Sequence, residues 1–238
     1  MKYLIGIDLG TSGTKTVLFD ETGKAVASST VEYPSYQPQN GWAEQDPLDW
    51  WNACVATLRG VLADSGITPR DVAGIGIAGQ MHGLVMLDEN GGVLRNSIIW
   101  CDGRTAAECG EITETVGAQR LIDITANPAL TGFTAGKILW VRKNEPALYA
   151  ECRHILLPKD YLRYKLTGVY ATEVSDASGM NLLDVPKRQW SPEVLEKREI
   201  NAEWLPAMYG SCAVTGTVTE AAAQQTGLAA GIPVVGGA

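Results

Sequence analysis

A carboxylate and a hydroxyl-rich glycine turn follow one another near the start of the chain, in DLGTSGTK at residues 8–15. Backbone N–H groups in such a turn can point into one concavity and hold phosphate oxygens. The hydroxyls of Thr11, Ser12 and Thr14 are further donors, and Lys15 adds a compact positive charge. Asp8 offers a hard oxygen that suits a hydrated magnesium ion, which usually takes one or two carboxylates. The segment predicts a phosphate and magnesium site, and taken alone it equally fits a plain hairpin.

Three polar or soft side chains lie between two glycines in GQMHG, residues 79–83. The amide of Gln80 and the imidazole of His82 are directional hydrogen-bonding groups, and Met81 offers an apolar wall. This mixture suits a small polyol or sugar. The alternative is a loop whose histidine is simply hydrogen-bonded, which is the commoner situation for a single histidine.

An indole, a carboxylate and a guanidinium occur together in WCDGR, residues 100–104. Trp100 could stack on the C–H face of a sugar, while Asp102 and Arg104 could bind its hydroxyls. A surface Asp–Arg pair beside a core tryptophan would account for the same residues. The segment therefore indicates a sugar site only in combination with the other two.

The three segments lie at the ends of predicted strands. Apolar runs and alternation predict strands over residues 3–9, 14–19, 25–33, 74–78, 98–100, 155–157 and 232–235, with a hairpin over 84–94. Periodicity and capping residues predict helices that begin at Pro47 and that cover 105–116, 135–143, 158–166, 192–198 and 220–226. Asp46 is a suitable N-cap before Pro47. This alternation of strands and helices predicts an α/β fold.

Composition narrows the class of partner. The 238 residues include 27 Asp and Glu against 19 Lys and Arg, which gives a net charge of -8. Nucleic acid and anionic membranes both require a basic face, so neither is expected as a partner. The five cysteines lack a C-x-x-C spacing, and no apolar run approaches the ~20 residues of a membrane span. We expect a reduced, cytoplasmic protein, and two histidines exclude a multi-histidine metal site.

Six segments, taken in order, resemble one protein family. They are DLGTSGTK at 8–15, WAEQDP at 42–47 with WW at 50–51, GIAGQMHG at 76–83, IWCDGR at 99–104, LLPKDYL at 156–162 and SDASG at 175–179. Over nearly the whole chain they resemble the FGGY family of carbohydrate kinases, and within it the members that act on D-xylulose. The GQMHG segment is the most specific, because glycerol kinases carry a different, charged sequence there.

The resemblance implies a ribonuclease-H-like, actin-like ATPase fold, with a mixed sheet flanked by helices. Residues 1–238 would form the N-terminal, sugar-binding lobe of a two-lobed kinase, and the nucleotide-binding lobe is absent from the chain. Asp8 would lie near Mg²⁺ and the transferred phosphate of ATP, and the hairpin from Thr11 to Lys15 would lie against that phosphate. Met81 and His82 would contact the ketose. The same pocket would be lined by Trp100, Asp102 and Arg104.

The resemblance also implies that the general base is an aspartate directly after the Gly236-Gly237-Ala238 turn, beyond the end of this sequence. We therefore expect the parent protein to convert ATP and D-xylulose into ADP and D-xylulose 5-phosphate, and these 238 residues alone to be inactive. Other possibilities are a kinase for ribulose, gluconate or glycerol, a non-catalytic sugar-binding module, and a structural actin-like or chaperone-like ATPase. We expect the parent to be a homodimer, and the isolated lobe to self-associate through the face that meets the second lobe.

Overall fold

Alternating apolar and polar residues build the first three strands, which are joined by hairpins. The computed structural model describes residues 1–237. In β1 (Tyr3–Leu9) the buried side chains alternate with accessible ones, as they do in β2 (Gly13–Asp20). The two strands pair antiparallel, and β3 (Ala25–Glu32) pairs antiparallel with β2. Because side chains alternate between faces, one face of this hairpin sheet is apolar and can be covered by a helix.

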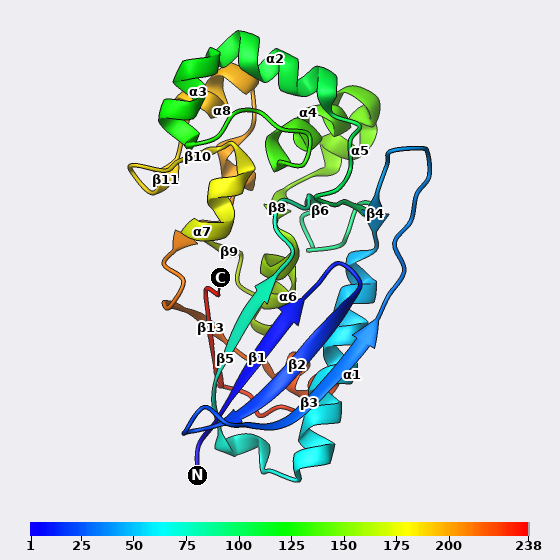
Figure 1. Ribbon diagram of the computed structural model, residues 1–238, viewed down its shortest axis with the longest axis vertical. Helices are drawn as coiled ribbons and strands as arrows, with labels where there is room; N and C mark the ends of the chain where they lie inside the picture. The colour runs from blue at the N-terminus through cyan, green and yellow to red at the C-terminus, as the bar shows by residue number, and fades with distance from the viewer. Residues whose placement is uncertain (238) are drawn as a thin grey trace.

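Three further strands extend the sheet to six, in the order β13-β14-β5-β1-β2-β3. Both β5 (Val72–Gly79) and β14 (Pro233–Val235) run parallel to β1, whereas β13 (Val214–Thr217) runs antiparallel to β14. The sheet is therefore mixed. The carboxyl ends of β1 and β5 meet at one edge of this sheet (Figure 1).

Helices cover one face of the sheet. The first is α1 (Pro47–Ser65), whose N-cap Asp46 accepts a hydrogen bond from the Leu48 N–H over 2.8 Å. Its apolar side packs on β2 and β3, and α6 (Pro158–Thr167) and α9 (Glu220–Thr226) lie beside it. Figure 1 shows α1 and α6 behind the sheet. On the opposite face, the side chains of Leu4 and Asp8 in β1 and of Lys15 in β2 are exposed.

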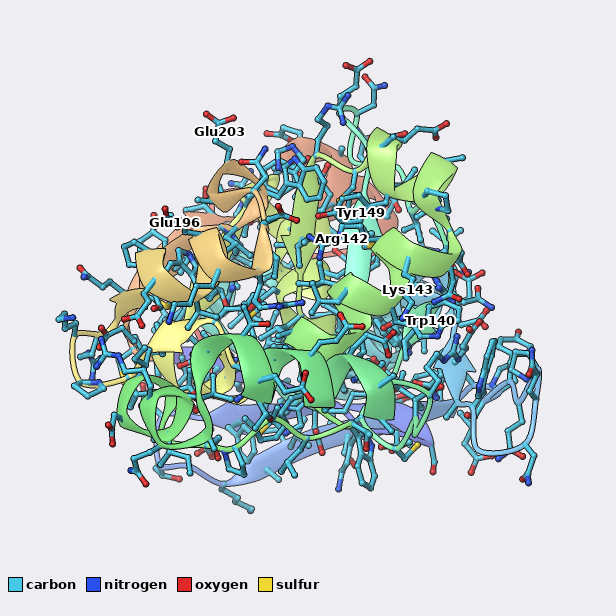
Figure 2. The ribbon with its side chains drawn as sticks, turned by 90° about the horizontal axis from the view of Figure 1, so that it is seen from above. Trp140, Arg142, Lys143, Tyr149, Glu196 and Glu203 are labelled. Atoms are coloured by element: carbon cyan, nitrogen blue, oxygen red, sulfur yellow. The ribbon has the colours of Figure 1, made fainter. Side chains whose placement is uncertain are left out.

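The remaining elements form a helical half above the sheet (Figure 1). Its helices are α2 (Ala106–Val116), α3 (Ala118–Thr125), α4 (Thr134–Asn144), α5 (Pro146–Glu151), α7 (Val174–Ala177) and α8 (Pro192–Arg198), with short 3-10 turns at η2 (Ser178–Met180) and η3 (Ala202–Trp204). A third 3-10 turn, η1 (Pro69–Asp71), lies at the other end of the sheet, directly before β5. Its short strands are β4 (Glu44–Gln45), β6 (Val85–Leu87), β7 (Ser97–Ile98), β8 (His154–Leu156), β9 (Ala171–Glu173), β10 (Leu183–Asp184), β11 (Gln189–Trp190) and β12 (Ala207–Tyr209). A second apolar core fills this half. Figure 2 views it from above.

The predicted mixed sheet with flanking helices is confirmed, and the strand predicted to end at Trp100 ends two residues earlier. Residues 98–100 were expected to be extended, but β7 ends at Ile98. The reason is a turn, because the Asp102 N–H donates to the Ile99 carbonyl over 3.2 Å. This turn leaves Trp100 on an exposed loop. No helix among residues 1–237 has the length and apolar character needed to cross a membrane, and Ala238 lies outside the described residues.

Candidate functional site

A hollow of about 340 Å³ opens where β1 and β5 end. Leu9 is in register with Gly79, and the Gln80 N–H donates to the Leu9 carbonyl over 2.7 Å, which places the loops after both strands side by side. The hollow is lined by Gly10, Thr11, Gly79, Gln80, Met81, His82 and Trp100. The structure thus brings together residues from all three segments that the sequence singled out.

Two large apolar groups form exposed walls of this hollow. The side chain of Trp100 is 48% exposed and that of Met81 is 37% exposed, although both are large and hydrophobic. The indole Nε1 donates to Thr11 Oγ1 over 2.9 Å, so the ring is held against the glycine turn. A fixed, exposed indole offers a flat surface on which the C–H face of a sugar can stack.

Gln80 supplies a buried polar group at the base of the hollow. Its Nε2 donates to Gln45 Oε1 over 2.8 Å, and Gln45 in turn donates to the Thr11 carbonyl over 2.7 Å. Among residues 1–237, the Gln80 Oε1 has no hydrogen-bond partner. Because an unpaired buried oxygen is costly, this atom is a candidate acceptor for a ligand hydroxyl.

His82 is half-buried beside the hollow and is held in an unusual backbone conformation. Its φ is +66°, which is the left-handed region that favours glycine. The ring lies 4.5 Å from that of Phe133, and Nδ1 lies 3.1 Å from the carbonyl oxygen of Gly179. Burial lowers the pKa of His82, and the positive charge of Lys137 lowers it further. The imidazole is therefore neutral at pH 7.

The structure places Lys137 and Phe133 beside His82, and neither residue stands out in the sequence as part of a site. Lys137 is fully buried in α4, and its Nζ donates to the His82 carbonyl over 2.7 Å. A signal for Lys137 was present, since it stands in a helix of mostly apolar residues, among them Ile138, Leu139 and Val141, which are also buried. A lysine on an apolar helix face is expected to be buried with a partner.

Asp8 is exposed at the carboxyl end of β1 and lines an adjoining hollow of about 520 Å³. It is in register with Lys15 on β2 and with Ala78 on β5, so it lies at the same sheet edge as Met81 and His82. The hollow is lined by Gly6, Ile7, Asp8, Lys15, Val17, Phe19, Gly76, Ile77, Ala78, Ser211, Cys212 and Gly237. A predominantly apolar hollow with one carboxylate and one ammonium at its edge fits a site that another part of a protein completes.

The oxygens of Asp8 suit a magnesium ion that keeps most of its water. Within residues 1–237, no group of three or more His, Cys, Asp or Glu is arranged to hold a metal. Asp8 accepts no hydrogen bond from any described side chain. Since Mg²⁺ is commonly bound by one or two carboxylates together with substrate phosphates and water, the single free carboxylate fits this ion.

The structure corrects the assignment of Thr14 to phosphate binding. Its side chain is fully buried and in register with Leu9, on the sheet face that α1 covers. Lys15 points the opposite way, because neighbouring strand residues face opposite sides. Thr11 lines the strand-end hollow and Ser12 is exposed at the turn, so these two and Lys15 remain predicted phosphate contacts.

Asp102 and Arg104 also lie elsewhere than predicted. Both side chains are almost fully buried, and neither lines the hollow. Arg104 Nη2 donates to Asp102 Oδ2 over 2.7 Å, and the same oxygen accepts the Ala43 N–H over 2.6 Å. The Arg104 guanidinium stacks 3.7 Å from the ring centre of Trp42. The pair therefore supports the loop that carries Trp100 and is not free to bind a sugar.

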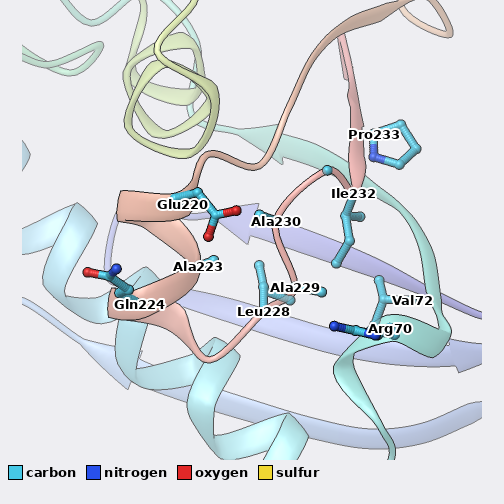
Figure 3. Close-up of a pocket in the computed structure, with 11 residues that line it drawn as sticks. Arg70, Val72, Glu220, Ala223, Gln224, Leu228, Ala229, Ala230, Ile232 and Pro233 are labelled. Atoms are coloured by element: carbon cyan, nitrogen blue, oxygen red, sulfur yellow. The ribbon is translucent and has the colours of Figure 1, made fainter.

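A larger hollow, of about 690 Å³, lies at the other end of the sheet (Figure 3). It is bounded by Val72 and Pro233, where β5 and β14 begin. Its charged residues, Arg70 and Glu220, are both exposed. In open sheets of this kind, ligands bind at the carboxyl ends of the strands, so size alone does not make this hollow the functional one.

Known proteins resemble the chain in sequence and in fold. It is 43% identical to the "Xylulose kinase" of Bacillus subtilis over 228 residues, which are 96% of this chain and 46% of that protein. It superposes with a TM-score of 0.95 on the crystal structure of xylulose kinase from Rhodospirillum rubrum, at 29% identity, covering 100% of this chain and 49% of the other. Gluconate kinase from Lactobacillus acidophilus gives a TM-score of 0.92 at 29% identity, with 100% of this chain and 48% of the other covered.

The chain spans about half the length of the relatives it matches. The fit to solved sugar kinases confirms the predicted actin-like ATPase fold. The model of the "FGGY family of carbohydrate kinases, N-terminal domain" matches residues 3–238. The strand-end hollow, the fold and this match agree, and the chain belongs to the FGGY family of carbohydrate kinases.

Proposed function

We propose that the protein transfers the γ-phosphoryl group of ATP to D-xylulose, giving D-xylulose 5-phosphate and ADP, and that this chain supplies the sugar-binding half of the site. The observation that carries the proposal is the position of Asp8 at the same sheet edge as the hollow formed by Met81, His82 and Trp100. The carboxylate that would serve a magnesium-bound phosphate therefore lies next to the pocket that would hold a polyol.

The lining of the hollow supports a small polyhydroxylated ligand. Its volume of about 340 Å³ falls at the lower end of the usual range for ligand pockets. The indole of Trp100 and the thioether of Met81 would contact the carbon skeleton. Gln80 and His82 would bind hydroxyl groups. The similarity to named xylulose kinases favours a ketose over glycerol or gluconate.

Asp8 would hold Mg²⁺, and the turn with Thr11, Ser12 and Lys15 would contact the transferred phosphate. When bound, the ion neutralises negative charge on the phosphate oxygens. In phosphoryl transfer, positioning and charge neutralisation provide most of the rate enhancement. The residues of this chain would orient the attacking hydroxyl and exclude water. The general base and the adenosine site are expected in a second lobe that follows Ala238.

The predominantly apolar hollow beside Asp8 supports the expectation that another lobe covers this face. Val17, Phe19 and Ile77 contribute to its lining, and a large apolar surface favours association in water. We expect the 238-residue chain to self-associate at high concentration, and the parent protein to be a homodimer. A strictly monomeric chain in light scattering would contradict the first expectation.

The proposal is tested by assaying ADP release with D-xylulose, D-ribulose, D-gluconate and glycerol. The full-length protein should have its highest kcat/KM with D-xylulose, and the 238-residue chain should show no turnover. A higher kcat/KM with another substrate would overturn the substrate assignment. If the chain alone turned over at the rate of the full-length protein, the proposal that it supplies only the sugar-binding half of the site would be overturned. Tight binding of D-xylulose by the chain alone in calorimetry would instead favour a non-catalytic sugar-binding module.

A further inference from the structure

Lys137 is a buried cation without an acidic partner. The side chain is fully buried, and among residues 1–237 no carboxylate lies within ion-pair distance of its ammonium group. The nitrogen instead donates to two backbone carbonyls, those of His82 and Gly132, each over 2.7 Å. An unpaired buried ammonium is costly, and an apolar side chain of similar size would be cheaper for stability alone. The position of Lys137 therefore calls for a reason beyond packing.

The carbonyl that Lys137 holds belongs to the strained residue of the candidate site. The same oxygen of His82 also accepts a hydrogen bond from Thr134 Oγ1 over 3.1 Å. His82 has a φ of +66°, and such a conformation in a residue other than glycine persists only where the surroundings impose it. Two donors from the first turn of α4 impose it here.

The ring of His82 is fixed as firmly as its backbone. Nδ1 lies 3.1 Å from the carbonyl oxygen of Gly179, which can only accept, so Nδ1 carries the hydrogen. Nε2 is then left with its lone pair in the neutral ring. A Cβ on Gly179 would collide with this ring. The imidazole is therefore confined between Gly179 and Phe133.

We propose that Lys137 is a positioning residue of the strand-end hollow: its ammonium group holds the Met81–His82 turn, so that Nε2 of the His82 ring accepts a hydroxyl hydrogen of the ligand. Only the identity of that ligand rests on the proposed function. The hollow then recognises a hydroxyl that donates to His82, and an analogue that carries hydrogen in place of that hydroxyl binds more weakly.

The charges around Lys137 are consistent with this role. Burial lowers the pKa of Lys137 to about 7, while the negative charge of Asp102 opposes that shift. Arg104 acts in the same direction as burial, and it also neutralises Asp102. On His82 the positive charge of Lys137 adds to the effect of burial. Removal of this charge should therefore raise the pKa of His82.

The inference can be tested on the 238-residue chain without a ligand, because the chain has two histidines. In NMR spectra of the imidazole C–H groups, Lys137→Met should shift the His82 signal and raise its pKa, and should leave the His154 signal unchanged. Lys143→Met is the matched control, since Lys143 lies on the same helix (Figure 2) with 59% of its side chain exposed. This control should change neither histidine.

A second variant keeps the test decisive if Lys137→Met does not fold. Thr134→Val removes one donor to the His82 carbonyl without a change of charge, and it should shift the His82 signal. An unmoved His82 signal in either folded variant would overturn the proposal. In the full-length protein, Lys137→Met should raise KM for D-xylulose by about tenfold, as expected when a charge-assisted hydrogen bond is lost, with KM for ATP unchanged. If KM is unchanged while the NMR shift is present, the ligand assignment fails and the positioning role stands.

Discussion

The indole Nε1 of Trp100 donates a hydrogen bond to Thr11 Oγ1 over 2.9 Å, although the two residues are 89 positions apart in the chain. One partner is an exposed aromatic ring on the wall of the hollow, and the other belongs to the glycine turn proposed to contact phosphate. The bond joins the two parts of the site. The orientation of the ring that we propose to stack on the sugar therefore depends on the conformation of the turn that we propose to contact phosphate.

Removal of either partner of this bond should weaken sugar binding, and the effects of the two removals should not add. In the full-length protein, Trp100→Phe and Thr11→Val should each raise KM for D-xylulose severalfold, and the double variant should resemble the worse single variant. The coupling should be about 1 kcal/mol, as for one neutral hydrogen bond. Trp204→Phe, in the helical half, should leave KM unchanged. Strictly additive effects would show that the bond does not orient the ring.

Asp8 should act on the chemical step rather than on sugar affinity. Asp8→Asn keeps the size of the side chain and removes the charge that would hold Mg²⁺. We expect kcat of the full-length protein to fall by about 100-fold to 1,000-fold, the usual loss for one electrostatic group at a transferred centre. KM for D-xylulose should change little. Asp64→Asn, at an exposed position near the end of α1, is the control, and an equal loss there would contradict the role of Asp8.

The lowered pKa of Lys137 predicts a specific dependence of stability on pH. Burial lowers this pKa from 10.5 to about 7, so between these values the unfolded chain holds a proton that the folded chain has lost. The free energy of unfolding then rises with pH across this window. The free energy of unfolding of the wild type, taken relative to that of Lys137→Met, should rise by about 1.4 kcal/mol per pH unit between pH 7.5 and 9. Urea unfolding at several pH values measures this free energy. A difference between the two proteins that does not change with pH would contradict the lowered pKa of Lys137.

The sheet half could be predicted because its signals are local. Alternation marks β1 and β2, and the Asp46-Pro47 pair marks the start of α1. The pairing of β9 with β12 could not be predicted, since each has three residues that are extended only because the other strand is present. Short strands without alternation carry no signal of their own.

The site was predictable where it coincides with strand ends, and not where it depends on tertiary contacts. Gln80 and Met81 follow one predicted strand, Trp100 was predicted to end another, and all three line the hollow. Lys137 and Gly179 contact His82 from 55 and 97 residues away in the chain, so nothing local connects them. The misassignment of Thr14 was avoidable, because alternation along residues 14–19 already places it opposite to Lys15.

A buried ionic pair beside Gly236, near the C-terminal end of the chain, should matter more for stability than a surface pair. Arg163 and Asp160 are fully buried and joined over 2.5 Å, and Arg163 also donates to the carbonyl of Gly236. Arg163→Met would leave a buried carboxylate unpaired, and the free energy of unfolding should fall by about 3–5 kcal/mol. Arg120→Met, which breaks an exposed pair with Glu193 over 2.5 Å, should cost less than about 1 kcal/mol. Similar losses in urea unfolding would contradict the distinction.

The absence of a side chain at Gly179 should be required for sugar binding and not for folding. Gly179 has an ordinary φ, but a Cβ there would collide with the His82 ring. Gly179→Ala should therefore displace the imidazole and raise KM of the full-length protein for D-xylulose by about tenfold or more, as expected for a lost hydrogen bond with a strained pocket.

Gly110→Ala is the matched control, because a Cβ at this position in α2 meets no atom within 4 Å. It should leave KM unchanged and should raise the free energy of unfolding by about 0.5–1 kcal/mol, since alanine is the better helix former. An unchanged KM in Gly179→Ala, with the His82 NMR signal also unchanged, would show that the ring has room to move. The close contact between Gly179 and His82 would then have no part in ligand recognition.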